Sequence, residues 1–197
     1  MAFWVTEAGV DGFRCDYAEG VPQDFWTEAL AYLRTLDSDI ILLAEGDKSW
    51  LYEVGFDVMY AWSFPGTLEN VFGGKGGAST LFEAFNKDMA NVPEGKSRMR
   101  YIINHDTASE NSPISLYGGE RGAMAAFVMA TMLEGCPLIY SSQEIGYSKS
   151  LSFFSNNVMN WDSNKAYTDE YIKVMAAFNS TRDVRVKDPV FANTGNI

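Results

Sequence analysis

The chain has little cysteine, histidine or positive charge. Its 197 residues include 2 Cys, 1 His and 15 Lys plus Arg, against 26 Asp plus Glu, which gives a formal net charge of −11. Because such a surface repels phosphate backbones and anionic lipid head groups, we expect neither nucleic acid nor a membrane as a partner. Hydrophobic runs stay well short of the roughly 18 residues that a membrane-spanning helix needs.

The few cysteines predict free thiols rather than a disulfide. Cys15 stands between Arg14 and Asp16 in a predicted strand, so its side chain should face the opposite side, towards a layer of helices. Cys136 precedes a different strand. We expect both side chains to be buried, on different layers.

What the sequence does contain is three short apolar runs that each stop at an acid. They lie at residues 9–16, 39–45 and 100–106, and they end at Asp16, Glu45 and Asp106. The branched residues at 40–44 and the expected strand at 101–103 are typical of strands buried on both faces of a parallel sheet. In such sheets ligand sites form beyond the carboxyl ends of the strands, so the three acids should converge.

Each acid also has a purely structural interpretation. An acid just after a strand is often the N-cap of the next helix, and a lone histidine beside an aspartate, as in His105-Asp106, is commonly a structural pair. Three separate strands ending in acids at one expected rim favour a functional site over three coincidences.

The residues resemble a known family. Gly12-Phe-Arg-Cys-Asp16, Leu43-Ala-Glu45 and Asn104-His-Asp106 are similar, in order and rough spacing, to three sequence signatures of the α-amylase family, glycoside hydrolase family 13. The segment from Gly135 to Gly146 resembles the last barrel strand of that family and the loop after it.

This resemblance implies a role for each site residue. Asp16 matches the catalytic nucleophile, Glu45 the general acid and base, and Asp106 the third acid, which holds sugar hydroxyls; Arg14 and His105 match substrate-contacting neighbours. Side chains alternate along a strand, so Arg14 lies beside Asp16 and favours its ionised form. No basic residue follows Glu45 until Lys48, so burial should favour its neutral, proton-donating form.

The resemblance further implies an α/β fold, a partial TIM barrel of about five β/α units, strands four to eight. A closed barrel typically takes about 250 residues, and the family's third-strand signature has no counterpart before Gly9. We therefore expect residues 1–197 to form the C-terminal half of a catalytic domain, without the N-terminal barrel half or the accessory β-domain towards which the tail after Arg182 leads. The expected elements are helices at 23–36, 79–90, 122–133 and 168–179, strands ending at Asp16, Glu45, Tyr60, Ile103 and Tyr140, and loops at 66–80 and 107–119.

The implied substrate is an α-1,4-linked, starch-like glucan, with Tyr60 and Trp62 stacking on glucose rings. Transglycosylases and enzymes specific for α-1,6 bonds or sucrose share the same motifs. No cofactor is expected, and no structural metal, since the family's calcium ligands come largely from the third-strand region. The alternative is a catalytically incompetent fragment, at most a carbohydrate-binding or self-associating module, since open barrel edges favour self-association.

Overall fold

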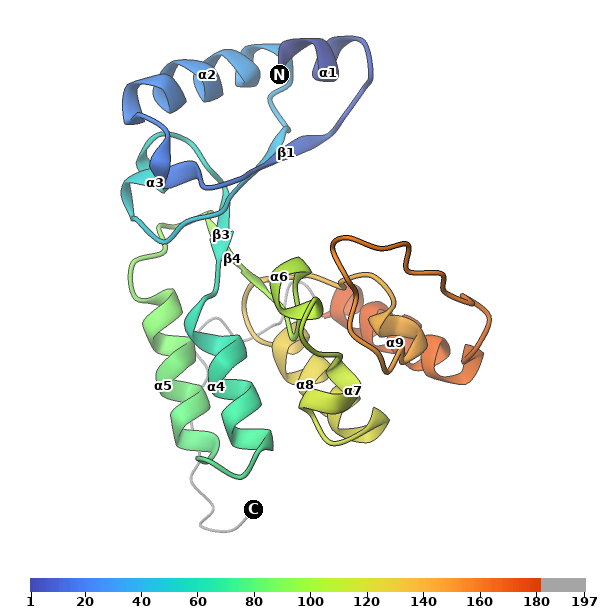
Figure 1. Ribbon diagram of the computed structural model, residues 1–197. Coiled ribbons are helices and arrows are strands. Elements are labelled where there is room, and N and C mark those ends of the chain that lie inside the picture. Colours follow the sequence, from blue (N-terminus) through green and yellow to red (C-terminus); the bar gives the residue numbers. More distant parts are fainter. Residues whose placement is uncertain (182–197) are drawn as a thin grey trace. The chain divides into compact units, whose positions relative to one another are not determined.

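The computed structural model describes residues 1–181, and the predicted tail after Arg182 lies outside them. The chain forms two compact units (Figure 1): Met1–Trp62 with Asp88–Met99, and Ser63–Lys87 with the described residues from Arg100 onward. In the described part of the chain, no helix is both long and apolar enough to cross a bilayer.

The first unit contains a parallel sheet. Its elements are α1 (Ala2–Thr6), β1 (Gly12–Cys15), the 3-10 turn η1 (Ala18–Gly20), α2 (Gln23–Leu36), β2 (Ile41–Ala44), α3 (Trp50–Glu53), β3 (Val58–Tyr60) and β4 (Ser97–Arg100), whose last residue belongs to the second unit. The pairs β1–β2, β2–β3 and β3–β4 are parallel. Since Cys15 pairs with Ala44, the residues that follow β1 and β2 leave the sheet at the same edge.

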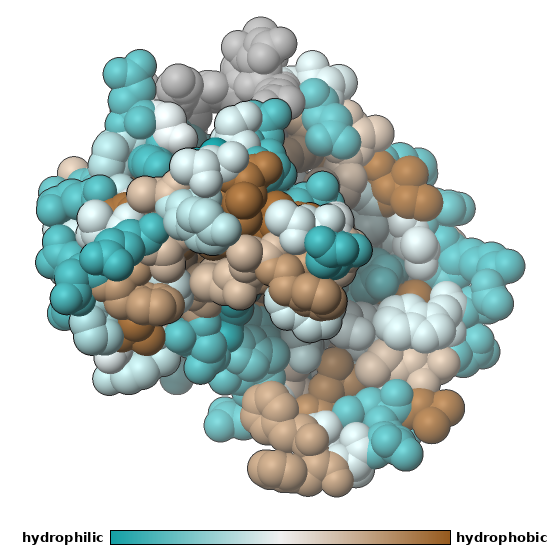
Figure 2. All heavy atoms as spheres, turned by 90° about the horizontal axis from the view of Figure 1, so that it is seen from above, coloured by the Kyte–Doolittle hydropathy of each residue, from teal (hydrophilic) through white to brown (hydrophobic). Residues whose placement is uncertain are grey.

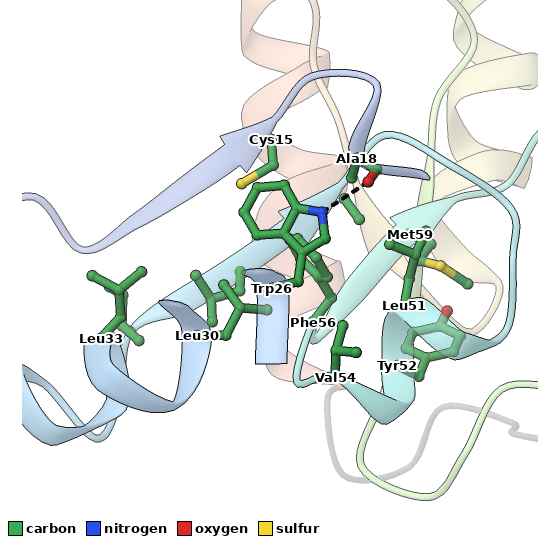
Figure 3. Packing of buried hydrophobic residues seen from close by; sticks show 13 residues of the cluster. Cys15, Ala18, Trp26, Leu30, Leu33, Leu51, Tyr52, Val54, Phe56 and Met59 are labelled. Carbon is green, nitrogen blue, oxygen red and sulfur yellow. Dashed lines mark hydrogen bonds between the residues drawn. The ribbon is translucent and has the colours of Figure 1, made fainter. Parts of the chain in front are cut away.

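Helix α2 has the predicted bounds. Phe25, Ala29, Leu33 and Leu36 recur at helical spacing in the sequence, yet Phe25 is 50% exposed. The buried residues are Trp26, Leu30 and Leu33, and they pack with Cys15, Phe56 and other apolar side chains (Figure 3). The buried and the exposed residues both fit the helical period. Trp26 fixes which face is buried, because its indole Nε1 donates to the Ala18 carbonyl at 2.8 Å.

The cysteines divide between the core and the surface. Cys15 is buried against α2 (Figure 3), as strand alternation predicted. Burial raises the pKa of its thiol to about 11, so the group stays protonated at neutral pH. Cys136 is exposed, so the prediction that it is buried was wrong; both cysteines are free thiols.

Asp57 and two cations form a charge network at the amino-terminal ends of β3 and β4. Asp57, just before β3, accepts from the Arg34 guanidinium at 2.6 Å and from the Lys96 ammonium at 3.1 Å. Its other carboxylate oxygen accepts from the Leu42 backbone N–H at 2.9 Å. The network therefore links α2, β2 and the segments that lead into β3 and β4.

The second unit is mainly helical. It contains α4 (Ser63–Phe72), most of α5 (Ala78–Met89), α6 (His105–Ala108), α7 (Pro113–Leu116), α8 (Glu120–Met132), β5 (Cys136–Pro137), the 3-10 turn η2 (Gln143–Ile145) and α9 (Lys165–Ser180). In the described residues the strand order is β1-β2-β3-β4-β5. The Leu138 N–H donates to the Arg100 carbonyl at 2.8 Å, next to β5.

Several predicted boundaries in this region were wrong. Residues 66–80 were expected to be a loop, but α4 runs to Phe72, because Phe64 and Leu68 lie one turn apart and are both fully buried. The third strand that ends in an acid was expected at 101–103, whereas β4 covers Ser97–Arg100. The polar loop expected at 107–119 holds part of α6 and all of α7.

Large apolar side chains also remain on the surface. Those of the first unit include Phe3, Trp4, Tyr32 and Ile41. On the face shown in Figure 2, hydrophobic residues (brown) lie in small groups among hydrophilic ones (teal).

Candidate active site

Arg14 lies at the centre of the candidate site in the first unit. Its Nε donates to the Tyr60 hydroxyl at 3.1 Å, one terminal nitrogen contacts the Asp16 carboxylate, and the other lies 2.8 Å from Glu45 Oε1. Burial alone would lower the pKa of Arg14, but the hydrogen bonds to Tyr60 and Asp16 and the charge of Glu45 raise it above its usual value. The guanidinium is therefore a permanent cation shared by two carboxylates.

The two carboxylates differ in exposure. Asp16 follows β1 and its side chain is 78% exposed, whereas the Glu45 side chain, after β2, is 19% exposed. The Tyr17 backbone N–H donates to Glu45 Oε2 at 2.8 Å, from a residue in the left-handed region (φ 42°, ψ 47°). Thus Asp16 is accessible to a reacting atom, while both oxygens of Glu45 are held by donors.

This geometry overturns one premise of the sequence reasoning. Glu45 was expected to lack a basic neighbour before Lys48, but Arg14 contacts it from the adjacent strand. Residues far apart in the chain become neighbours through strand pairing, which spacing along the sequence does not reveal.

A pocket of about 390 Å³ opens beside Glu45, lined by Tyr17, Glu19, Glu45, Gly46, Asp47 and Trp62. The Trp62 Nε1 donates to the Gly46 carbonyl at 3.3 Å, and its ring stacks on Tyr60 with centroids 4.7 Å apart. Trp62 is 41% exposed and lines the pocket, whereas Tyr60 is 4% exposed and does not. Of the two aromatic side chains expected to contact sugar, Trp62 is the accessible one.

Sequence reasoning missed four lining residues, Tyr17, Glu19, Gly46 and Asp47. Each follows Asp16 or Glu45 within three positions. That proximity to a strand end was the available signal, since residues just beyond the carboxyl ends of parallel strands line ligand sites.

His105 and Asp106 belong to the second unit, where they form a pair of their own. His105 Nε2 lies 3.4 Å from Asp106 Oδ1, and both side chains are more than a third exposed. The N-cap of α6 is Asn104, whose side-chain oxygen accepts from the Thr107 N–H at 3.0 Å. Asp106 is therefore not needed as the cap, and its convergence with Asp16 and Glu45 stays a prediction.

The chain is similar to a protein family and to characterised relatives. The family profile described as "Alpha amylase, catalytic domain" matches residues 1–191. The alpha-amylase MalA of Haloarcula japonica is 37% identical over 144 residues, which are 70% of this chain and 20% of MalA.

Solved structures agree in fold. A cyclic alpha-maltosyl-(1→6)-maltose hydrolase from Arthrobacter globiformis, in complex with maltose, superposes with a TM-score of 0.77 at 21% identity, over 89% of this chain and 42% of that one. An alpha-amylase from Lactobacillus plantarum gives a TM-score of 0.73 at 25% identity, over 87% and 45% of the two chains.

The fold class expected from the sequence is therefore confirmed. Parallel strands that alternate with helices, and structural relatives matched over part of their length, correspond to part of an α/β barrel. The chain spans about a fifth of MalA and less than half of each of these structures. With a family profile covering residues 1–191, the chain belongs to the α-amylase family.

Proposed function

We propose that this chain carries the bond-cleaving residues of a retaining α-glucan hydrolase, which acts on α-1,4-glucosidic bonds in starch-like poly- or oligosaccharides. Asp16 is the nucleophile, Glu45 the general acid and base, and Asp106 the third acid. The single observation that carries the proposal is the sharing of the Arg14 guanidinium by an exposed and a shielded carboxylate. A retaining glycosidase needs two carboxyl groups close together with different tasks.

The chemistry follows from these positions. Asp16 attacks the anomeric carbon and forms a glycosyl ester, while the bond from that carbon to the glycosidic oxygen breaks and Glu45 gives its proton to the leaving oxygen. Glu45 then takes a proton from water, whose oxygen attacks the same carbon and releases Asp16. Arg14 keeps Asp16 ionised for the first step, because a cation in direct contact favours the charged form.

Both oxygens of Glu45 are already held by donors. One terminal nitrogen of Arg14 lies 2.8 Å from Oε1, and the Tyr17 N–H donates to Oε2 at 2.8 Å. To reach the leaving oxygen, Glu45 must give up one of these contacts, and we infer that a bound sugar displaces it.

The other residues bind the sugar. Asp106 and His105 contact hydroxyl groups, and the exposed Trp62 ring stacks on the apolar face of a glucose unit in the pocket. The pocket is lined by neutral and acidic residues, which suits an uncharged glucan.

The first experiment measures hydrolysis and binding separately. We expect reducing-sugar release from soluble starch, and a change in Trp62 fluorescence when maltooligosaccharide is added, which the variant W62F abolishes. Binding without hydrolysis would support the alternative function, a carbohydrate-binding module without activity. Neither binding nor hydrolysis, in a folded chain, would refute both.

We also propose that the chain self-associates through the free side of β1. Within the described residues β1 pairs only with β2, and the neighbouring Ile41 is 58% exposed. An open strand edge with apolar neighbours is a template for pairing with another chain. Sedimentation velocity should show dimers that increase with concentration, and the variant I41K should shift the distribution towards monomer. A monomer at all concentrations would contradict this proposal.

A further inference from the structure

We propose that Tyr60 is a positioning residue, whose buried hydroxyl orients the Arg14 guanidinium so that its two terminal nitrogens face Asp16 and Glu45. The effect of Tyr60 on catalysis rests on the proposed function. The test measures the mobility of the Arg14 side chain and does not require hydrolysis.

The three nitrogens of Arg14 have three different partners. Nε donates to the Tyr60 hydroxyl at 3.1 Å, one terminal nitrogen contacts Asp16, and the other contacts Glu45 at 2.8 Å. A guanidinium is planar and its donors form a fixed fork. Fixing the direction of the Nε–H therefore fixes where both terminal nitrogens point.

Neither carboxylate alone can fix that direction. Asp16 is mostly exposed, and an exposed ion pair holds its geometry weakly. Glu45 is better shielded, but a single contact to one terminal nitrogen leaves the guanidinium plane free to turn about it. The Nε–H bond to Tyr60 supplies the missing constraint.

Tyr60 is itself held rigidly. It is the last residue of β3, its ring is 4% exposed, and one face stacks on Trp62 with an interplanar angle of 18°. Its backbone carbonyl also accepts from Arg98 at 3.1 Å. Because so little of the ring reaches solvent, positioning Arg14 takes the place of the sugar stacking predicted for this residue.

Through Tyr60, sugar binding at Trp62 is linked to Arg14 and its two carboxylates. Trp62 stacks on Tyr60 and also lines the pocket, so a sugar that packs on Trp62 presses on the residue that holds Arg14. Tyr60 therefore connects the binding surface with the two carboxylates without touching the substrate.

Nitrogen-detected NMR of the arginine side chains tests this inference. In the unmodified chain, the Arg14 Nε–H should exchange with water at least about tenfold more slowly than that of the exposed Arg121, and the two terminal nitrogens should give separate signals. The variant R14K identifies the Arg14 signals by removing them. Exchange as fast as that of Arg121 would overturn the proposal without any further variant.

The variant Y60F removes the hydroxyl and keeps the ring. We expect the Arg14 Nε–H to exchange about tenfold faster in Y60F and its terminal nitrogens to average into one signal. Y52F is the matched control, because Tyr52 is equally buried in the same unit and its hydroxyl donates to the Ser97 carbonyl at 2.8 Å, away from Arg14. Unchanged Arg14 signals in Y60F, or equal changes in Y52F, would refute a specific role for Tyr60.

Discussion

Replacing Asp16 with Asn is expected to lower the rate of glucan hydrolysis by at least about a thousandfold, because an amide oxygen does not form the glycosyl ester. The substitution removes only a charge, and the side chain is mostly exposed, so the unfolding free energy should change by less than about 1 kcal/mol. Initial rates on maltooligosaccharide, with urea unfolding of the same samples, separate the two effects. Asp24, exposed on α2, supplies the control D24N, which should keep full activity.

The companion variant E45Q distinguishes acid from nucleophile. General acid catalysis contributes typically about a hundredfold to ten-thousandfold, and we expect a loss in that range on maltooligosaccharide. The loss should shrink on an aryl α-glucoside, whose phenolate leaves without a proton, whereas the loss in D16N should be the same on both substrates. D47N, which removes a charge from the same pocket, is the matched control. Equal substrate dependence in D16N and E45Q would contradict the assigned roles.

The part of this site that was predictable from sequence lies along single strands. Alternation placed Arg14 beside Asp16 and sent Cys15 into the core, and both predictions were confirmed. The bounds of α2 were also predictable, because Pro22 and the apolar period mark them clearly.

What was not predictable depends on register and packing. The contact between Arg14 and Glu45 follows from the pairing of β1 with β2, and register is set by the whole sheet rather than by either strand. Strand β4 covers Ser97–Arg100 rather than the expected 101–103, and its Arg98 and Arg100 are buried among aromatic rings. Long cationic side chains pack along apolar surface, which a hydrophobic pattern does not record.

The largest expected effect on stability comes from Asp57. Its carboxylate is three-quarters buried and contacts Arg34 and Lys96, which are also mostly buried. D57N keeps the shape but leaves two shielded cations without their counter-charge, and breaking a buried ion pair costs about 3–5 kcal/mol. Because some solvent reaches the group, we expect a loss of about 2–3 kcal/mol in the unfolding free energy at pH 7. The exposed Asp39 provides the control D39N, with a change below about 0.5 kcal/mol.

The stabilisation of the fold by the Asp57 carboxylate should depend on pH. Burial alone would raise the pKa of Asp57, but hydrogen bonds from Arg34, from the Leu42 N–H and from Lys96 outweigh it and lower the folded-state pKa. In the unfolded chain the carboxyl has a pKa of about 3.9. The stabilisation is therefore fully present above that pH and is lost as the pH falls through the lower folded-state value. Urea unfolding at several pH values should show a constant gap between the unmodified chain and D57N above about pH 5, narrowing below about pH 4. A gap that stays constant down to the acid limit of folding would show that Asp57 stabilises the fold through its shape and not through its charge.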